Sequence, residues 1–453
     1  MKIQIIQNIN SVIEIAASLR SSRRLRYVSA SRRRSSLIPA LLSVYFILMA
    51  GMAQAEAVDI DNLTETALSK NIKLESLKYG VSASESAESY AGSLNDPMVT
   101  FGIVNEGTNY TVGGEGMSRY TVMVSQMFPF FGKLDAKQLE AKYKTQALRE
   151  SIRAEKLEVV NSVRSLYLDL YTVQESKKLL NTKMKLIQMT ESSAQAKYSS
   201  GMMDSKDVLM VQREKYMVIE AIEMMNEKER MLKSSLAHVT GRDSDDFGEF
   251  ALLPEKELNL DGQNLYQMAV ESSVTLKSME NEVSAMEANL KMKELEKYPD
   301  FTVSLGYEPR PGYTMSDVYS ASIGFNIPLY YKTRQLPAIN EAKAQKLKAD
   351  ATYYNMRHEL RSMITELTAS ADASKRIMDI YQSGISAKAD QTRDAALAAY
   401  RQGRGSAADV IAAVNTSVEY RMKYLEKYSE REKSLSRLNV LTGGKLYGTN
   451  IGD

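Results

Sequence analysis

The chain has 453 residues, 44% of them hydrophobic and 25% charged, with no Cys, no Trp, two His and nine Pro. The lack of Cys excludes disulfides, thiolate metal sites and cysteine nucleophiles. His238 and His358 stand too far apart in the sequence to build a His-rich zinc site within one chain. No phosphate-binding Gly loop, catalytic triad or nucleic-acid patch occurs, so we expect no enzyme, no cofactor, no metal site and no nucleic-acid partner.

The N-terminal region predicts export from the cytoplasm. The first 55 residues contain eight basic residues and one acidic residue, which leaves 50 basic and 55 acidic residues, about −5, in the remainder. An apolar run, Leu37–Gly51, precedes the small residues Ala53 and Ala55, as in a secretory signal peptide. We expect residues 1–55 to be this signal, with a translation start downstream of Met1 left open. The alternative is a membrane anchor, but 15 apolar residues fall short of the roughly 20 needed.

The rest of the chain is an internal duplication. Thr64–Ser76 aligns with Tyr266–Ser278 at an offset of 202 residues, while Pro129 and Pro328 are offset by 199. One offset kept across separated landmarks indicates two copies of one unit. We divide the chain into a first repeat, 56–262, a second repeat, 263–444, and a C-terminal tail, 445–453. The other pairs at offset 202 are Pro97 and Pro299, Tyr198 and Tyr400, Gly201 and Gly403, Asp207 and Asp409, and Gly241 and Gly443.

Each repeat contains two segments in which apolar residues alternate with small or polar ones, a pattern typical of β-strands. The alternation is clear over Phe301–Tyr307 and Tyr319–Ile327 and weaker over Val99–Val104 and Tyr120–Met127. It fits a membrane barrel with a wet interior, and equally a half-buried hairpin of a soluble sheet. On the first interpretation the lipid-facing side chains are Phe301, Val303, Leu305, Ile323 and Phe325.

Long helices surround these strands. We expect helices at about 62–93 and 264–297 before the strand pairs and at 133–197 and 333–399 after them. No Pro lies between Phe130 and Leu253 or after Pro337, as uninterrupted helices require. Each long helix would extend about 100 Å, turn at a Gly and return through about 35 residues. No apolar segment of 18 residues follows the signal, so we expect no membrane-spanning helix.

Four strands cannot close a barrel, because the smallest bacterial barrels need about eight. Open strand edges in lipid would leave N–H and C=O groups without hydrogen-bond partners. If the strands enter a membrane, several chains must therefore share one barrel.

From about residue 59 to 444 the chain resembles a TolC-type outer membrane efflux channel. The resemblance rests on the duplication, the paired hairpin tips and helix ends, and the motifs NDPMVTFG, SQMFPFFGKL and GFNIPLYYKTRQLPAI. It implies a mainly α fold with membrane β: a homotrimer in the outer membrane of a Gram-negative bacterium, whose protomers each give four strands to a shared transmembrane barrel. Long antiparallel helical hairpins would form a periplasmic α-barrel that meets a periplasmic adaptor and an inner-membrane pump.

The motifs NDPM and QMFPFFGK are similar to the branch that serves heavy-metal pumps of the resistance-nodulation-division (RND) type, for copper and silver or cobalt, zinc and cadmium. Drugs or a secreted polypeptide are the alternative cargoes. A soluble periplasmic coiled-coil scaffold without a pore is the alternative class. Many family members carry a lipid on Cys; without Cys, the barrel and the trimer would hold this chain in the membrane.

The resemblance places a periplasmic gate at the hairpin turns. Asp207 and Asp409 correspond to positions at the tunnel entrance, where a trimer would present up to six carboxylates that favour cations. Tyr400 matches a tyrosine that holds the tip closed, and Arg404 lies one residue from a gate arginine. The alternative is that the Ser and Asp residues only cap the returning helices. The residues expected to meet the adaptor are Gly201, Ser205, Gly403 and Ser406.

Five methionines recur every seven residues along the first returning helix. Thioethers prefer Cu(I), but residues seven apart are separated by about 10 Å along a helix, too far to chelate one ion. A seven-residue repeat also marks a coiled-coil seam with Met as flexible filler, and we favour that interpretation. The five are Met203, Met210, Met217, Met224 and Met231.

Overall fold

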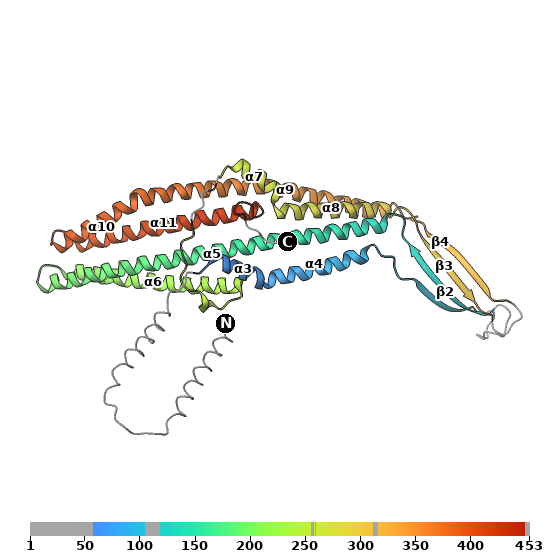
Figure 1. Ribbon diagram of the computed structural model, residues 1–453, viewed down its shortest axis with the longest axis horizontal. Helices are drawn as coiled ribbons and strands as arrows, with labels where there is room; N and C mark the ends of the chain where they lie inside the picture. Colours follow the sequence, from blue (N-terminus) through green and yellow to red (C-terminus); the bar gives the residue numbers. More distant parts are fainter. Residues whose placement is uncertain (1–57, 105–117, 255–257, 259, 311–315, 449–453) are drawn as a thin grey trace, which may run out of the picture. The chain divides into compact units, whose positions relative to one another are not determined.

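The computed structural model describes residues 58–104, 118–254, 258, 260–310 and 316–448, all within one compact unit, Ala57–Asp453 (Figure 1). The predicted signal peptide, residues 1–55, and the last five residues of the predicted tail lie outside the described residues.

Both repeats fold into the same order of elements: two successive helices, two strands, a long helix and a returning helix. The first repeat comprises α3 (Ile60–Lys70), α4 (Ile72–Ala91), β1 (Met98–Val104), β2 (Arg119–Phe128), α5 (Lys133–Ser199), α6 (Ser205–Thr240) and a 3-10 turn (Ser244–Asp246). The second comprises α7 (Gly262–Ser272), α8 (Val274–Leu295), β3 (Asp300–Glu308), β4 (Val318–Asn326), α9 (Gln335–Ile380), a π-helical turn (Tyr381–Ile385), α10 (Ser386–Arg401) and α11 (Ala407–Leu441).

The helices predicted before the strands are each divided in two, which corrects the expectation of single helices. The breaks fall at Asn71 and Ser273, again 202 residues apart, and both residues have extended ψ angles. The Asn71 side chain accepts a hydrogen bond from the Leu74 N–H, and Ser273 accepts one from Leu276. Asn and Ser are favoured N-caps because their side chains satisfy the free N–H groups of a new helix.

The long helix of the first repeat is α-helical throughout, whereas that of the second includes one π-helical turn. α5 has 67 residues, about 100 Å of helix. The helix predicted over 333–399 is helical from Gln335 to Arg401, and the residues that flank the π-helical turn all have αR dihedral angles. The offset between equivalent residues of the two repeats changes from 199 back to 202 residues before α9 begins. Gly132 precedes α5 and Arg334 precedes α9 at offset 202, and the extra residues form the turn 329–334.

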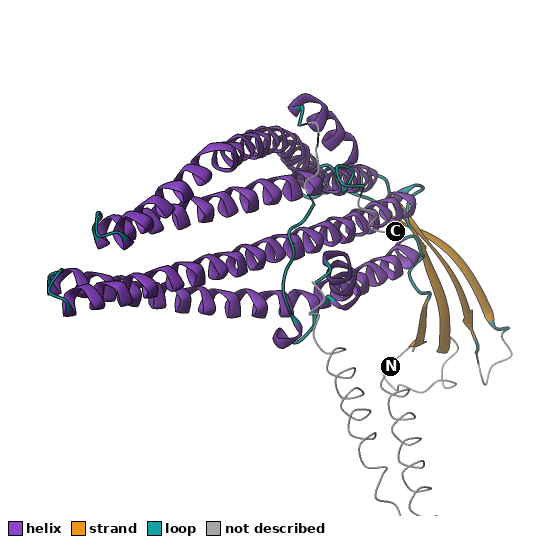
Figure 2. Cartoon of the chain, turned by 60° about the vertical axis from the view of Figure 1, so that its left-hand side comes forward, coloured by secondary structure: helices purple, strands orange, loops and turns teal. Residues whose placement is uncertain are grey.

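The four strands form one antiparallel sheet in the order β1-β2-β3-β4 (Figure 2). The central pair, β2 and β3, joins the two repeats. Asp300 at the start of β3 accepts a hydrogen bond from the Phe130 N–H at 2.7 Å, and its carboxylate pairs with Lys133 Nζ at 2.7 Å. The sheet is therefore tied to the first turn of α5.

Apolar clusters and a polar seam join the helices of the two repeats. Tyr167 of α5 and Tyr428 of α11 are buried in one cluster, and their hydroxyls hydrogen-bond the loop at Ala251 and Leu253. Beside it, α5 and α11 are linked by several polar pairs in succession. These pairs are Arg164 with Glu432 at 3.0 Å, Glu158 with Arg437 at 2.5 Å, Asp169 with Lys433 at 2.6 Å and Asn161 with Ser436 at 2.9 Å.

Candidate functional site

One face of the sheet is mainly apolar across all four strands, with the polar Gln126 of β2 opposite Val303. The register pairs Phe301 with Phe325 and Val303 with Ile323. Residues two apart on a strand and directly opposed across strands share a face. Leu305 therefore lies on the same face, so the five residues predicted to face lipid come together. Their neighbours on β1 and β2 are Val99, Phe101, Ile103, Tyr120, Val122, Val124 and Phe128.

The opposite face carries mostly small and polar side chains, and its apolar members are Met98, Val104, Met123, Met127 and Val318. Ser125, Ser304 and Ser322 form one cross-strand row, and the first two hydroxyls are 2.8 Å apart. Near one end of the sheet, Arg119 pairs with Glu308 at 2.5 Å on this face. The sheet thus separates an apolar side from a side that water can wet. No described helix contains an apolar stretch long enough to cross a membrane.

The sheet ends in two open edges. In the described part of the chain, β1 pairs with β2 and β4 pairs with β3, and no strand pairs with the outer side of either. Edge strands present rows of unpaired N–H and C=O groups that accept a further strand. A further strand can therefore pair with the described sheet at either edge, beside β1 or beside β4.

The first hairpin tip joins α5 to α6. Gly201 has φ 74°, in the left-handed region that favours glycine. Asp204 is the residue before α6, and its side chain makes no capping hydrogen bond. Ser205 is exposed at the first helical position, and Asp207 is half-buried in the first turn, where a carboxylate suits the helix dipole.

The second tip, between α10 and α11, is capped differently. Gly403 has φ 75°, and Arg404 is exposed beside it. Ser406 is the N-cap of α11, and its hydroxyl accepts a hydrogen bond from the Asp409 N–H at 3.1 Å, while the Asp409 carboxylate accepts from the Ser406 N–H at 3.1 Å. The Ser406 hydroxyl also donates to the Asp409 carboxylate at 2.7 Å, and this bond together with the Ser406 N–H bond lowers the pKa of Asp409. Reciprocal capping thus accounts structurally for Ser406 and Asp409, but not for Ser205.

Tyr400 lies between the two tips. Its ring is 2% exposed, in an apolar cluster built from α5, α6, α10 and α11, and burial raises its pKa. Lys197 of α5 has its Nζ 3.7 Å from the ring centroid and donates to the Tyr400 carbonyl at 2.5 Å. The Tyr400 hydroxyl contacts the Met203 sulfur at 4.0 Å. Tyr400 therefore fastens one tip to the other within the chain.

The sequence interpretation missed Lys197. The sequence did offer a hint: Lys197 aligns with Ala399 at the offset of 202 residues, so the two tips carry different side chains at this position. The equivalent tyrosines also differ, since Tyr198 is 52% exposed. The tips are thus related in sequence but not in environment.

The methionine stripe is only partly buried within the chain. Met203 and Met210 pack against the tip cluster. Met217, Met224 and Met231 are exposed on α6 of the single chain, so the coiled-coil seam expected for them stays a prediction. The described residues contain no group of three or more His, Cys, Asp and Glu side chains that could hold a metal ion.

Three solved structures share this fold. The outer-membrane channel OprN is 14% identical over 85% of this chain and 90% of its own, with a TM-score of 0.75. The outer membrane protein VceC of Vibrio cholerae is 16% identical over 85% and 96%, with a TM-score of 0.73. CusC, for which conformational changes accompanying folding and transmembrane channel formation are described, is 14% identical over 87% and 95%, with a TM-score of 0.74.

The sequence matches a family model as well as a fold. No curated protein sequence is significantly similar to the chain. The model described as "Outer membrane efflux protein" matches residues 65–226 and 265–444, one segment in each repeat. This match agrees with the prediction of an efflux function, and the solved structures agree with the prediction of a mainly α fold with long hairpins. The chain belongs to the outer membrane efflux protein family.

Proposed function

We propose that this protein is a trimeric outer membrane channel, the passive exit duct of a tripartite efflux system. The observation that carries the proposal is the open-edged sheet, which is mainly apolar on one face and mostly small and polar on the other. Strands of this kind are stable in lipid only when their edges are paired in a closed barrel. Phe301, Val303, Leu305, Ile323 and Phe325 would then contact lipid.

The helical hairpins would extend into the periplasm of a Gram-negative bacterium, with their tips toward the inner membrane. Gly201, Ser205, Gly403 and Ser406 would meet a periplasmic adaptor, which connects the channel to an inner-membrane pump of the RND type. Tyr400 and Arg404 would hold the tips closed. Opening would then be a shift in population between closed and open tips.

Heavy-metal cations are the cargo that we propose. Three copies of Asp207 and Asp409 would place up to six carboxylates at the entrance, and a ring of carboxylates favours cations. Replacing both with Ala should lower the cation preference and the block by multivalent cations in planar bilayers. Unchanged selectivity would remove these carboxylates from the pore.

The channel itself is tested by fractionation and conductance. The protein should float with outer membranes, migrate as a trimer in detergent and conduct ions in planar bilayers. Recovery as a soluble periplasmic protein without conductance would instead support a coiled-coil scaffold.

A further inference from the structure

The turn between β4 and α9, residues 329–334, is exposed along its whole length. Its sequence is LYYKTR, and Leu329 and Tyr330 are 80% and 74% exposed. Its backbone forms a defined turn, because the Thr333 and Arg334 N–H groups both donate to the Tyr330 carbonyl, at 3.1 and 2.9 Å. The turn thus holds large apolar and aromatic side chains in solvent, as surfaces that bind a partner do.

The turn also carries unbalanced positive charge. Lys332 and Arg334 are exposed and form no ion pair with any residue that the structure describes. The sequence contains no Asp or Glu between Asp317 and Glu341. The first turn of α9 has no acidic residue either, whereas that of α5 contains Asp135. The positive end of the α9 dipole therefore adds to the two cations.

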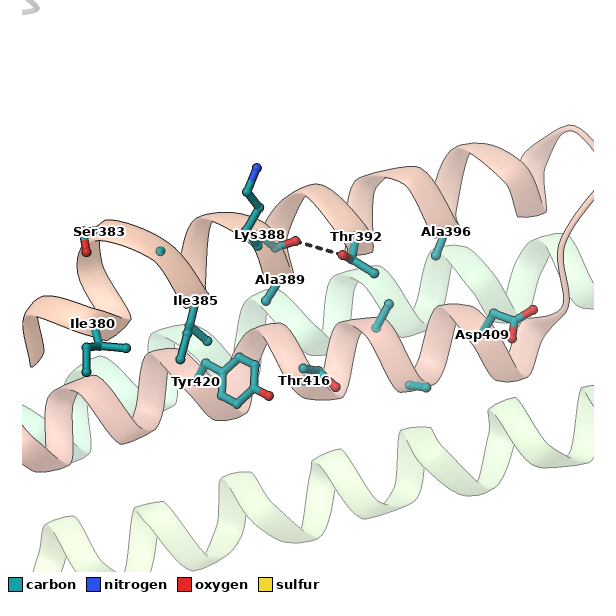
Figure 3. A pocket seen from close by; sticks show the side chains of 13 residues that line it. Ile380, Ser383, Ile385, Lys388, Ala389, Thr392, Ala396, Asp409, Thr416 and Tyr420 are labelled. Carbon is teal, nitrogen blue, oxygen red and sulfur yellow. Dashed lines mark hydrogen bonds between the residues drawn. The ribbon is translucent and has the colours of Figure 1, made fainter. Parts of the chain in front are cut away.

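The groove between α10 and α11 has a different character. Its cavity of about 830 Å³ is lined mainly by small and apolar side chains, and its charged residues are one base and one acid, Lys388 and Asp409 (Figure 3). The groove lining therefore has no excess charge, whereas 329–334 has two positive charges and no negative one. Of these two exposed features, only the turn favours an anion.

The first repeat shows how such a turn lies once a neighbouring strand is present, because β3 pairs beside β2. Its Phe131 remains 77% exposed, and its ring centroid is 6.3 Å from that of Phe301 on the apolar face of the sheet. By equivalence, Tyr330 should stay exposed on the apolar side when β1 of the next chain pairs with β4. The equivalent residues, 199 apart, are Phe130 and Leu329, Phe131 and Tyr330, and Lys133 and Lys332.

The two equivalent lysines have different surroundings. Lys133 Nζ lies 2.7 Å from the Asp300 carboxylate and donates to the Tyr298 carbonyl at 3.1 Å. The residue equivalent to Asp300 at offset 202 is Met98, at the start of β1. The next chain would therefore bring a methionine to Lys332 where Lys133 meets a carboxylate. The charge of Lys332 is left for a ligand outside the protein.

We propose that the turn 329–334 binds the headgroup of an anionic phospholipid. The exposed apolar side chains of β4 continue through Ile327 to Leu329, so the two tyrosines of the turn lie where hydrocarbon meets water, a level at which tyrosine is favoured. The lysine and arginine pair with the lipid phosphate, while their stems lie along apolar surface. This inference rests on the proposed function, because it needs the apolar face of the sheet to contact lipid.

Fluorescence quenching by brominated lipids tests the proposal, because the chain has no Trp. Tyr330→Trp in the full protein, reconstituted into bilayers, becomes the only Trp and lies in the turn. Brominated phosphatidylglycerol should quench it more than brominated phosphatidylcholine, with a relative binding constant several-fold above one. Adding Lys332→Gln and Arg334→Gln should bring this constant close to one. Because the constant is a ratio within one variant, partial loss of folded protein would not imitate the effect.

Phe131→Trp is the matched control, because it lies on the equivalent turn, whose lysine already pairs with Asp300. Its relative binding constant should be close to one. Asp96→Asn removes the one carboxylate just before β1 in the sequence and should not change the constant of Tyr330→Trp. Inorganic phosphate, added at constant ionic strength, should not change it either.

Equal quenching of Tyr330→Trp by both lipids in a protein that conducts ions would overturn the inference and leave the channel intact. A preference that appears only after Asp96→Asn would also overturn it, because Lys332 would then pair with the next chain. A preference abolished by inorganic phosphate would assign the cations to a free anion instead of a lipid. Quenching by neither lipid would contradict the channel as well, because the sheet would not meet a membrane.

Discussion

The sheet and the helical hairpins place their apolar side chains in opposite environments. Ile323 on the sheet is 64% exposed, whereas Leu168 in α5 is fully buried. On the sheet, the hydroxyls of Ser125 and Ser304 bond each other on the polar face, while in the hairpins most charged groups lie toward the surface. Because the hydrophobic effect acts on both regions, the difference teaches that the apolar face of the sheet lacks the cover that the hairpin cores have, and the proposed lipid contact would supply it.

The largest expected effect separates the two regions by truncation. Leu168→Ala should reduce the free energy of unfolding by about 2–5 kcal/mol, because it leaves a cavity in the core. Ile323→Ala, on the exposed face, should change it by only about 0.5 kcal/mol. Denaturant unfolding in detergent measures both values. Equal losses would mean that Ile323 is packed against protein.

The second prediction adds charge to the two faces of the sheet. Val303→Arg and Ile323→Arg should each oppose membrane insertion by about 2–4 kcal/mol near the bilayer midplane. Ser322→Arg lies on the polar face and serves as the control. The amount of each variant in the outer membrane fraction reports the effect. Normal insertion of Val303→Arg and Ile323→Arg alongside loss of Ser322→Arg would reverse the assignment of the faces.

A smaller effect distinguishes the two tips. Ser406→Ala removes the N-cap of α11 and should cost about 1 kcal/mol of unfolding free energy. Ser205→Ala should cost less, because Ser205 is exposed inside the first turn of α6 and does not cap it. Thermal unfolding of the two variants provides the comparison, and a larger loss for Ser205→Ala would contradict the capping assignment.

The smallest effect is a pH dependence of the second tip. Hydrogen bonds from Ser406 hold the pKa of Asp409 below its ordinary value of 3.8. The contribution of Asp409 to stability is therefore present above pH 3.8 and is lost as the pH falls through its lower folded-state pKa. Asp409→Asn should flatten the stability profile in this acidic window. A profile identical to that of the native protein would show that the capping box does not couple to pH.

Sequence reasoning found features that depend on local pattern or repetition. The mainly α fold with strands and long helical hairpins is confirmed, since alternation and the absence of Pro act locally. The tip turns at Gly201 and Gly403 also agree, because positive φ favours glycine. Features that depend on distant partners were missed. Lys197 gains its role from Tyr400, 203 positions away, and the exposure of Met217 depends on what α5 covers.

The claim that sister chains share one barrel can be tested directly at the open edges. The chain has no Cys, so Thr100→Cys on β1 can be combined with a Cys at Ser320, Ser322 or Gly324 on β4. Within one chain the two edge strands are three strand spacings apart, about 14 Å, beyond the reach of a disulfide. Oxidation in outer membranes should therefore link chains, with at least one pair giving a ladder that ends at the trimer. A protein that stays monomeric for every pair, and folded without detergent, would contradict the account.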